Sequence, residues 1–216
     1  ELCVSVFDWA KFQRTKGAIK LHLQLDHQGY LPCCAVLTDA NTGELSVARQ
    51  MAFEPGMIVV VDRGYFDYAL YQRWSSTGVY FVTRAHCNML YRVVERHAVG
   101  SRGHVLSDET IELSSAYAQK RCWTRLRRVV VRIDEKHKDL VFLTNLTHLA
   151  ASTIAAIYKE RWQIELFFKA LKQTLKVKTF VGTSENAVQV QIWTALIAML
   201  LLKYLWLKST WGWSLS

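Results

Sequence analysis

Two acidic residues in this sequence stand where carboxylate chemistry could be carried out. Asp62 directly follows the apolar run at 57–61, and Glu165 lies in a segment rich in lysine and arginine. Carboxylate oxygens are preferred ligands of Mg²⁺, and a pair of metal ions stabilises the attacking and leaving oxygens when a phosphodiester is cleaved. Asp62 and Glu165 together therefore predict a site that binds divalent metal and faces phosphate groups.

Basic side chains gather around Glu165 on a helix that the sequence predicts from 152 to about 176. At about 100° per residue, one stripe about 80° wide holds Glu165 together with Tyr158, Arg161, Lys169, Lys172 and Lys176. The stripe borders the apolar face of the helix, which would hold Glu165 close to a sheet. Cations in such a stripe are suited to neutralise phosphates around a metal site.

Each acid also has a purely structural interpretation. Glu165 could pair with Lys169 or Arg161 on an ordinary amphipathic helix, where each pair contributes about 0.2–0.5 kcal/mol. Asp62 could cap the turn that follows its strand. Trp123 raises the same choice, because an aromatic ring can stack on an unpaired base or pack within the protein. The residues alone leave these alternatives open, and they leave the role of Trp162 open as well.

The charge of the chain favours a polyanionic partner. Its 216 residues include 27 Lys or Arg and 18 Asp or Glu, which gives a net charge of +9. The excess is uneven, since residues 151–216 contain eight Lys or Arg and three Asp or Glu. A basic surface of this kind is typical of proteins that bind nucleic acid.

The elements that would position Asp62 alternate between strands and helices. An antiparallel hairpin is expected around the polar turn at 26–29, followed by a short helical segment at 43–53. The apolar runs at 57–62 and 79–85 are typical of strands buried on both faces of a sheet, and 65–78 between them is helical. This order predicts a mixed α/β sheet flanked by helices.

The second half of the chain changes character. Segments 126–133 and 140–146 are rich in β-branched and apolar residues and predict a β insertion, and two helices at 152–176 and 184–207 then close the chain. Ser152 or Thr153 is the expected N-cap of the first of these helices. We therefore divide the chain into a first catalytic segment, an insertion and a C-terminal helical segment, at 1–85, 86–150 and 151–216.

Other sequence features indicate the compartment. The five cysteines contain no C-x-x-C pair and fit a reducing cytosol. The apolar run at 192–202 is shorter than the roughly 20 residues that span a bilayer, so we expect a buried core helix and no membrane partner. The sequence does not start with Met, and we expect it to be a fragment of a longer protein.

The spacing Tyr158-x2-Arg161-x3-Glu165-x6-Lys172 resembles the Y-R-E-K signature of bacterial insertion-sequence transposases with a DDE catalytic triad. The segments "VVVDRGYFDY", "GVYFVTR" and "FVGTSENA" are similar to that family too, so the resemblance covers nearly the whole chain. It implies a ribonuclease H-like fold with a β-rich insertion before the Glu-bearing helix.

The resemblance also implies roles for individual residues. Asp62 and Glu165 would be two of the three catalytic acids and would hold Mg²⁺ or Mn²⁺. The expected DNA contacts are Tyr158, Arg161 and Lys172, with Lys169 and Lys176 beside them. The reaction would be hydrolysis of a phosphodiester at the element end, followed by strand transfer into target DNA. A homodimer would pair two double-stranded ends in the bacterial cytoplasm, at the nucleoid.

The sequence departs from the family at the first catalytic aspartate. In the family this residue lies on the first strand of the sheet, in a D-[SG]-[ST]-like context that is not found here. Asp8 also follows an apolar run, but its context does not match, and Asp26 and Asp39 are more simply turn residues. The alternative function is therefore a catalytically inactive, DNA-binding remnant of a transposase.

Overall fold

The computed structural model describes residues 2–4, 11–13, 16–100, 103–133, 138–174, 182 and 184–209, and the chain forms two compact units. We call Ala48–Arg161 the sheet unit. Glu1–Val47 and Trp162–Ser216 together are the hairpin unit. Each unit contains a hydrophobic cluster of its own.

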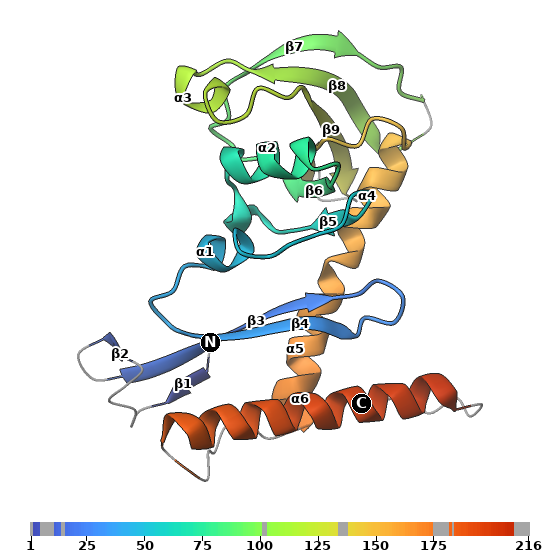
Figure 1. Ribbon diagram of the computed structural model, residues 1–216. Helices are drawn as coiled ribbons and strands as arrows, with labels where there is room; N and C mark the ends of the chain where they lie inside the picture. Colours follow the sequence, from blue (N-terminus) through green and yellow to red (C-terminus); the bar gives the residue numbers. More distant parts are fainter. Residues whose placement is uncertain are drawn as a thin grey trace. The chain divides into compact units, whose positions relative to one another are not determined.

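A six-stranded mixed sheet forms the centre of the sheet unit (Figure 1). Strands β5 (Ile58–Val60) and β6 (Tyr80–Arg84) run parallel, and every other neighbouring pair is antiparallel. From β6 the sheet continues through β10, β9, β8 and β7, which span Lys138–Thr144, Leu126–Ile133, Val105–Leu113 and Tyr91–Arg96. The predicted mixed α/β fold of the ribonuclease H-like class is confirmed.

The division into segments 1–85, 86–150 and 151–216 stays a prediction. Strands β7 to β10 all come from the middle segment, and β10 pairs directly with β6 of the first. The expected β-rich insertion therefore extends a sheet that the first segment begins.

Helices cover both faces of this sheet. Successive side chains of a strand point to opposite faces. On β6, Phe81 stacks on Tyr71 of α2 (Tyr68–Ser76), with ring centroids 4.5 Å apart. The next residue, Val82, belongs instead to a buried cluster with Ile154 of α4 (Ala151–Glu160). β6, the parallel neighbour of the strand that precedes Asp62, is thus covered on both faces.

Three short elements complete the helices before α5. They are α1 (Glu44–Ala48), η1 (Arg63–Tyr65) and α3 (Ala116–Gln119). The α2 helix ends as predicted before Gly78, which has φ +73°. This left-handed conformation costs glycine little, and it turns the chain from α2 into β6.

The hairpin unit is built on β3 (Lys16–Leu25). This strand pairs antiparallel with β4 (Pro32–Asp39), which confirms the predicted hairpin, and with the short strands β1 (Leu2–Val4) and β2 (Lys11–Gln13). Its apolar side chains pack with α5 (Trp162–Thr174) and α6 (Glu185–Lys208). The buried members of this cluster are Ile19, Phe167, Leu171, Val188, Ile192, Ala195, Leu196 and Met199.

The helix predicted from 152 to about 176 differs in three respects. It is divided into α4 and α5 at Arg161, whose N–H donates to the carbonyl of Tyr158 in a tight last turn. The N-cap is Ala150, because its carbonyl already accepts from Ile154, so the prediction of Ser152 or Thr153 is wrong. Residues 175–176 lie outside the described part of the chain.

The expectation of a buried core helix at 192–202 is correct for one face only. Helix α6 is longer than that apolar run and is buried along the side that faces β3 and α5. Large apolar side chains on its other side are exposed, with Ile197 at 56% and Leu201 at 58%. Among the described residues, α6 is the one helix whose length and mean hydropathy of 1.7 would allow it to cross a membrane, a criterion that core helices of soluble proteins also meet.

Candidate active site

Asp62 lies two residues beyond the end of β5 and caps the short helix η1. Its Oδ1 accepts a hydrogen bond of 2.7 Å from the backbone N–H of Gly64. The buried hydroxyl of Thr83 donates to the carbonyl of Asp62 at 3.2 Å. The capping interpretation is therefore correct, and it does not exclude the functional one. The Asp62 side chain is exposed, and within the described residues its Oδ2 accepts no hydrogen bond.

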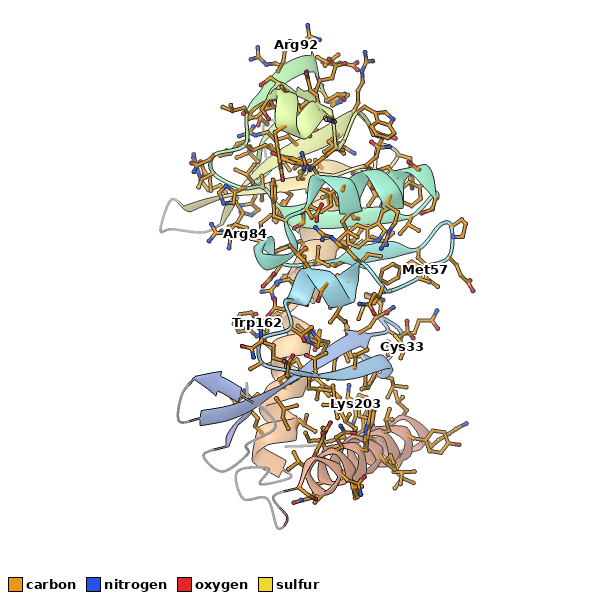
Figure 2. All side chains as sticks on the ribbon, turned by 60° about the vertical axis from the view of Figure 1, so that its left-hand side comes forward. Cys33, Met57, Arg84, Arg92, Trp162 and Lys203 are labelled. Carbon is orange, nitrogen blue, oxygen red and sulfur yellow. The ribbon has the colours of Figure 1, made fainter. Side chains whose placement is uncertain are left out.

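The parallel register places Arg84 beside Asp62. Val60 is paired with Val82, and the N–H of Val61 donates to the carbonyl of Val82 at 3.1 Å. Two residues further on, Asp62 and Arg84 leave neighbouring strands at the same carboxyl edge of the sheet, where α/β proteins bind ligands. Arg84 is half-buried and comes from the end of β6 (Figure 2).

Tyr158 links α4 to this edge of the sheet. Its side chain is buried in the core cluster, and its ring lies 4.9 Å from that of Phe142. Burial raises the pKa of the Tyr158 hydroxyl, the positive charges of Arg161 and Arg84 oppose this shift, and the negative charge of Asp62 adds to it. The hydroxyl therefore remains protonated at neutral pH and can donate a hydrogen bond.

Arg161 is placed at the end of α4 and close to the same tyrosine. Its guanidinium carbon lies 5.6 Å from the centroid of the Tyr158 ring. The sheet unit thus brings together one carboxylate, one hydroxyl and two guanidinium groups, from Asp62, Tyr158, Arg84 and Arg161. This set can bind a phosphate and offer one ligand to a metal ion.

The remaining predicted residues belong to the hairpin unit. Glu165 lies in the first turn of α5, where the helix dipole favours a negative charge, and its side chain is half-buried. Lys169 and Lys172 are exposed on the same helix. Lys176 and Asp8 lie outside the described residues. The Y-R-E-K signature is therefore divided, with Tyr158 and Arg161 in one unit and Glu165 and Lys172 in the other.

The donor atoms suit a hard divalent cation, because Asp62 and Glu165 offer carboxylate oxygens. Each unit supplies one of these two acids. In the part of the chain that the structure describes, no group of three or more His, Cys, Asp or Glu side chains is close enough to hold a metal ion.

Sequence reasoning did not nominate Arg84. Its position beside Asp62 depends on the parallel pairing of β5 with β6, which are separated by α2 in the sequence. The sequence offered one sign of this neighbourhood, namely two apolar runs of similar length, of which the first ends in an acid and the second in a base. The two ambiguous tryptophans are exposed, Trp123 at 72% and Trp162 at 55%, and so neither packs in a core.

Comparisons with known proteins agree with the sequence resemblance. A family model described as "Transposase DDE domain" matches residues 6–201. "Putative transposase y4zB" of Sinorhizobium fredii is 35% identical over 199 residues, which cover 90% of this chain and 55% of the relative. "Probable transposase for insertion sequence element IS5377" of Geobacillus stearothermophilus is 32% identical over 200 residues, covering 92% and 52%. The chain thus spans about half the length of these curated relatives.

A more distant relative extends the comparison. "Transposase InsG for insertion sequence element IS4" of Escherichia coli is 22% identical over 203 residues, which cover 88% of this chain and 44% of that protein.

Proposed function

Because this chain belongs to the transposase DDE domain family, we propose that it supplies the catalytic part of a transposase that cuts and joins DNA at insertion-sequence ends. The observation that carries the proposal is the placement of Asp62 at the carboxyl edge of the parallel strand pair, with Arg84, Arg161 and Tyr158 around it. An exposed acid among cations is suited to a polyanionic substrate that also brings a metal ion.

Asp62 and Glu165 are the residues that would hold Mg²⁺ or Mn²⁺. Such an ion supplies Lewis-acid stabilisation of the charge that develops on phosphate oxygens. Asp62 is accessible because its capping bond engages one oxygen only among the described residues. Glu165 is held on a helix that the hydrophobic core of its unit fixes through Phe167 and Leu171. Glu165 is thus carried by a packed helix, and Asp62 by the capped turn after β5.

The cations and the tyrosine would bind the DNA strand. Arg84 and Arg161 present guanidinium groups, which match phosphate oxygens in bidentate geometry. The Tyr158 hydroxyl stays protonated and can donate to a phosphate oxygen. Lys169, Lys172 and Lys176 would neutralise phosphates along α5 and beyond it. Each contact of this kind fixes the scissile bond without taking part in proton transfer.

The setting follows from the substrate. We place the protein in the bacterial cytoplasm at the nucleoid, where double-stranded element ends and target DNA are found. A homodimer would pair two ends before strand transfer. These statements rest on the family and on the net charge of +9.

Cleavage of element-end DNA tests the proposal. Protein from the complete reading frame is incubated with the terminal DNA of its own insertion sequence and Mg²⁺ or Mn²⁺, and nicked product is quantified. Asp62→Asn and Glu165→Gln should each abolish nicking, while Asp139→Asn, at an exposed acid paired with Arg132, should retain it. Full activity in either site variant, with folding confirmed by circular dichroism, would overturn the assignment.

A DNA-binding remnant without catalysis is the second candidate. It is favoured by one observation, namely that the D-[SG]-[ST]-like context of the family's first catalytic aspartate is not found in this sequence. A remnant should bind DNA with strong salt dependence and produce no nicked strand with any divalent metal. The cleavage assay therefore separates the two functions.

A further inference from the structure

Aromatic side chains form a connected series that begins at the carboxyl edge of the sheet unit. Phe66 follows Asp62 directly after η1. Its ring lies 5.4 Å from that of His86, which is exposed two residues beyond Arg84. The Phe66 ring also lies 4.9 Å from that of Tyr68, the first residue of α2. The rings therefore lead from the candidate active site onto α2.

Helix α3 continues this series. The ring of Tyr117 lies 6.5 Å from that of Tyr68, and Tyr117 is 63% exposed. The guanidinium carbon of Arg121 lies 3.7 Å from the centroid of the Tyr117 ring, and its Nη1 donates to the Tyr117 carbonyl at 3.4 Å. The ring is thus held in place by its neighbours while much of it stays open to solvent. Aromatic rings and guanidinium groups both stack on nucleic acid bases.

Trp123 is presented beside the same face of α2. The backbone N–H groups of Trp123 and Thr124 donate to Oε1 of Gln72 at 3.0 and 3.1 Å. Gln72 is buried and lies four residues beyond Tyr68, which places both on one face of the helix. Trp123 is 72% exposed, although its backbone is fixed in this way. We call the following residues the aromatic track: Phe66, Tyr68, His86, Tyr117 and Trp123.

The charges around the aromatic track favour an anionic partner. Arg63, Lys120 and Arg121 are exposed beside it. The acid next to Tyr68 is already engaged, because Asp67 caps α2 and pairs with Arg49. Aromatic residues and arginine are also common at the centre of protein interfaces. Three exposed cations beside the rings favour instead a partner that combines flat faces with negative charge, which describes a nucleic acid strand.

The open rings favour an unpaired strand over a duplex. In a duplex the bases stack on one another, so a side chain does not reach their faces unless a base leaves the stack. An unpaired strand offers the face of every base and is bound with little sequence preference.

We propose that the aromatic track binds an unpaired DNA strand, with bases stacked on Tyr117 and Trp123 and phosphates held by Arg63, Lys120 and Arg121. The strand would be the one next to the bond that is cut, and this placement rests on the proposed function. The stacking itself does not, because it depends only on residues outside the metal-binding pair.

Two oligonucleotides of equal length and charge test the stacking. Fluorescence anisotropy, in the absence of divalent metal, gives the affinity of the parent chain for labelled oligothymidylate and for an abasic strand that has the phosphates without the bases. Oligothymidylate should bind about 10-fold or more tightly. Tyr117→Ala and Trp123→Ala should each remove about 10-fold of the affinity for oligothymidylate and leave the affinity for the abasic strand unchanged.

Tyr117→Phe is the matched control, since it keeps the ring and should restore the affinity lost in Tyr117→Ala. Leu90→Ala removes an apolar side chain that is 63% exposed in the same unit, and it should bind like the parent. Photocrosslinking of the parent to an oligonucleotide that contains iodouracil, followed by mass spectrometry, should attach the DNA to Tyr117 or Trp123. This measurement does not depend on whether a variant folds.

Equal affinity of the parent for the two oligonucleotides would overturn the proposal, and so would crosslinks found only at other residues. A duplex of the same length that binds as tightly as oligothymidylate, and is weakened equally by Tyr117→Ala, would also contradict it. Failure of the proposed function is distinguishable, because it appears in the nicking assay as full activity of Asp62→Asn, whereas binding is measured without metal or cleavage.

Discussion

The sheet unit and the hairpin unit use their basic residues differently. In the sheet unit, arginine forms ion pairs with Asp or Glu on neighbouring strands or loops, as in Arg92–Glu112 and Arg127–Asp108. Lys169 and Lys172 of the hairpin unit are exposed and form no ion pair with the described residues. Arginines of the sheet unit mainly hold strands together, whereas the lysines of α5 are available to a polyanion.

Arg84 is an exception within the sheet unit. It forms no ion pair within the described residues, although it lies beside the carboxyl edge that carries Asp62. Arg92, near the start of β7, instead pairs with Glu112 at 2.6 Å. The contrast separates cations that stabilise the fold from cations that are left for a ligand, and it can be tested residue by residue.

The largest expected effect is the loss of the buried ion pair of the sheet unit. Arg127 contacts both carboxylate oxygens of Asp108, at 2.8 and 2.6 Å, and both residues are buried. Arg127→Met should lower the free energy of unfolding by about 3–5 kcal/mol, since it leaves Asp108 charged and unpaired. Urea denaturation measures the change.

The control for this pair is the double variant Arg127→Met with Asp108→Leu, which removes both charges and should recover much of the loss. Arg127 also donates to the carbonyls of Leu146 and Leu149, just before α4. A single variant as stable as the parent would mean that the pair does not anchor this part of the sheet.

A smaller effect is expected for the corresponding polar anchor of the hairpin unit. Lys203→Met removes the donor to the carbonyls of Gly29 and Tyr30 and keeps an apolar stem of similar length. Losing these two part-buried hydrogen bonds from a charged donor should cost about 1–3 kcal/mol. Lys208→Met, at an exposed position of the same helix, is the matched control and should unfold like the parent. Equal unfolding midpoints for the two variants would contradict the anchoring role.

The smallest effect concerns pH. Burial lowers the pKa of His22 from its ordinary value of 6.5, and the ring lies 2.9 Å from the hydroxyl of Thr38 across the hairpin. Below pH 6.5 the unfolded chain takes up a proton that the folded hairpin resists, so the stability contribution of neutral His22 is present above this pH and is lost as pH falls. Denaturation at pH 7.5 and 5.5 should show the loss, and His22→Gln should reduce it. An unchanged pH dependence in that variant would contradict this origin.

Local patterns were sufficient for much of the fold. The apolar runs at β5 and β6, the hairpin at 26–29 and the end of α2 at Gly78 all follow from side-chain periodicity and turn chemistry. Asp62 was predicted from the same kind of local pattern, because it directly follows an apolar run. These features depend on residues close together in the chain.

The remaining features depend on contacts between distant residues. A helical wheel placed Tyr158 and Glu165 on one stripe. In the structure, α4 packs on the six-stranded sheet and buries Tyr158, whereas α5 packs on β3. The periodicity of the sequence does not show that the two helices pack against different strands. The role of Arg84 required the parallel register of β5 and β6. The exposed side of α6 could not be distinguished from a core face by composition alone.

One measurement tests most directly whether cations that bind DNA can be told apart from cations that stabilise the fold. The affinity for element-end duplex DNA is determined over a range of salt concentrations for the parent, Arg84→Gln and Arg92→Gln. If Arg84 contacts a phosphate, its replacement flattens the slope of log K against log salt by about 0.9, whereas the ion-paired Arg92 leaves the slope unchanged. A slope that changes for Arg92→Gln and not for Arg84→Gln would contradict the account.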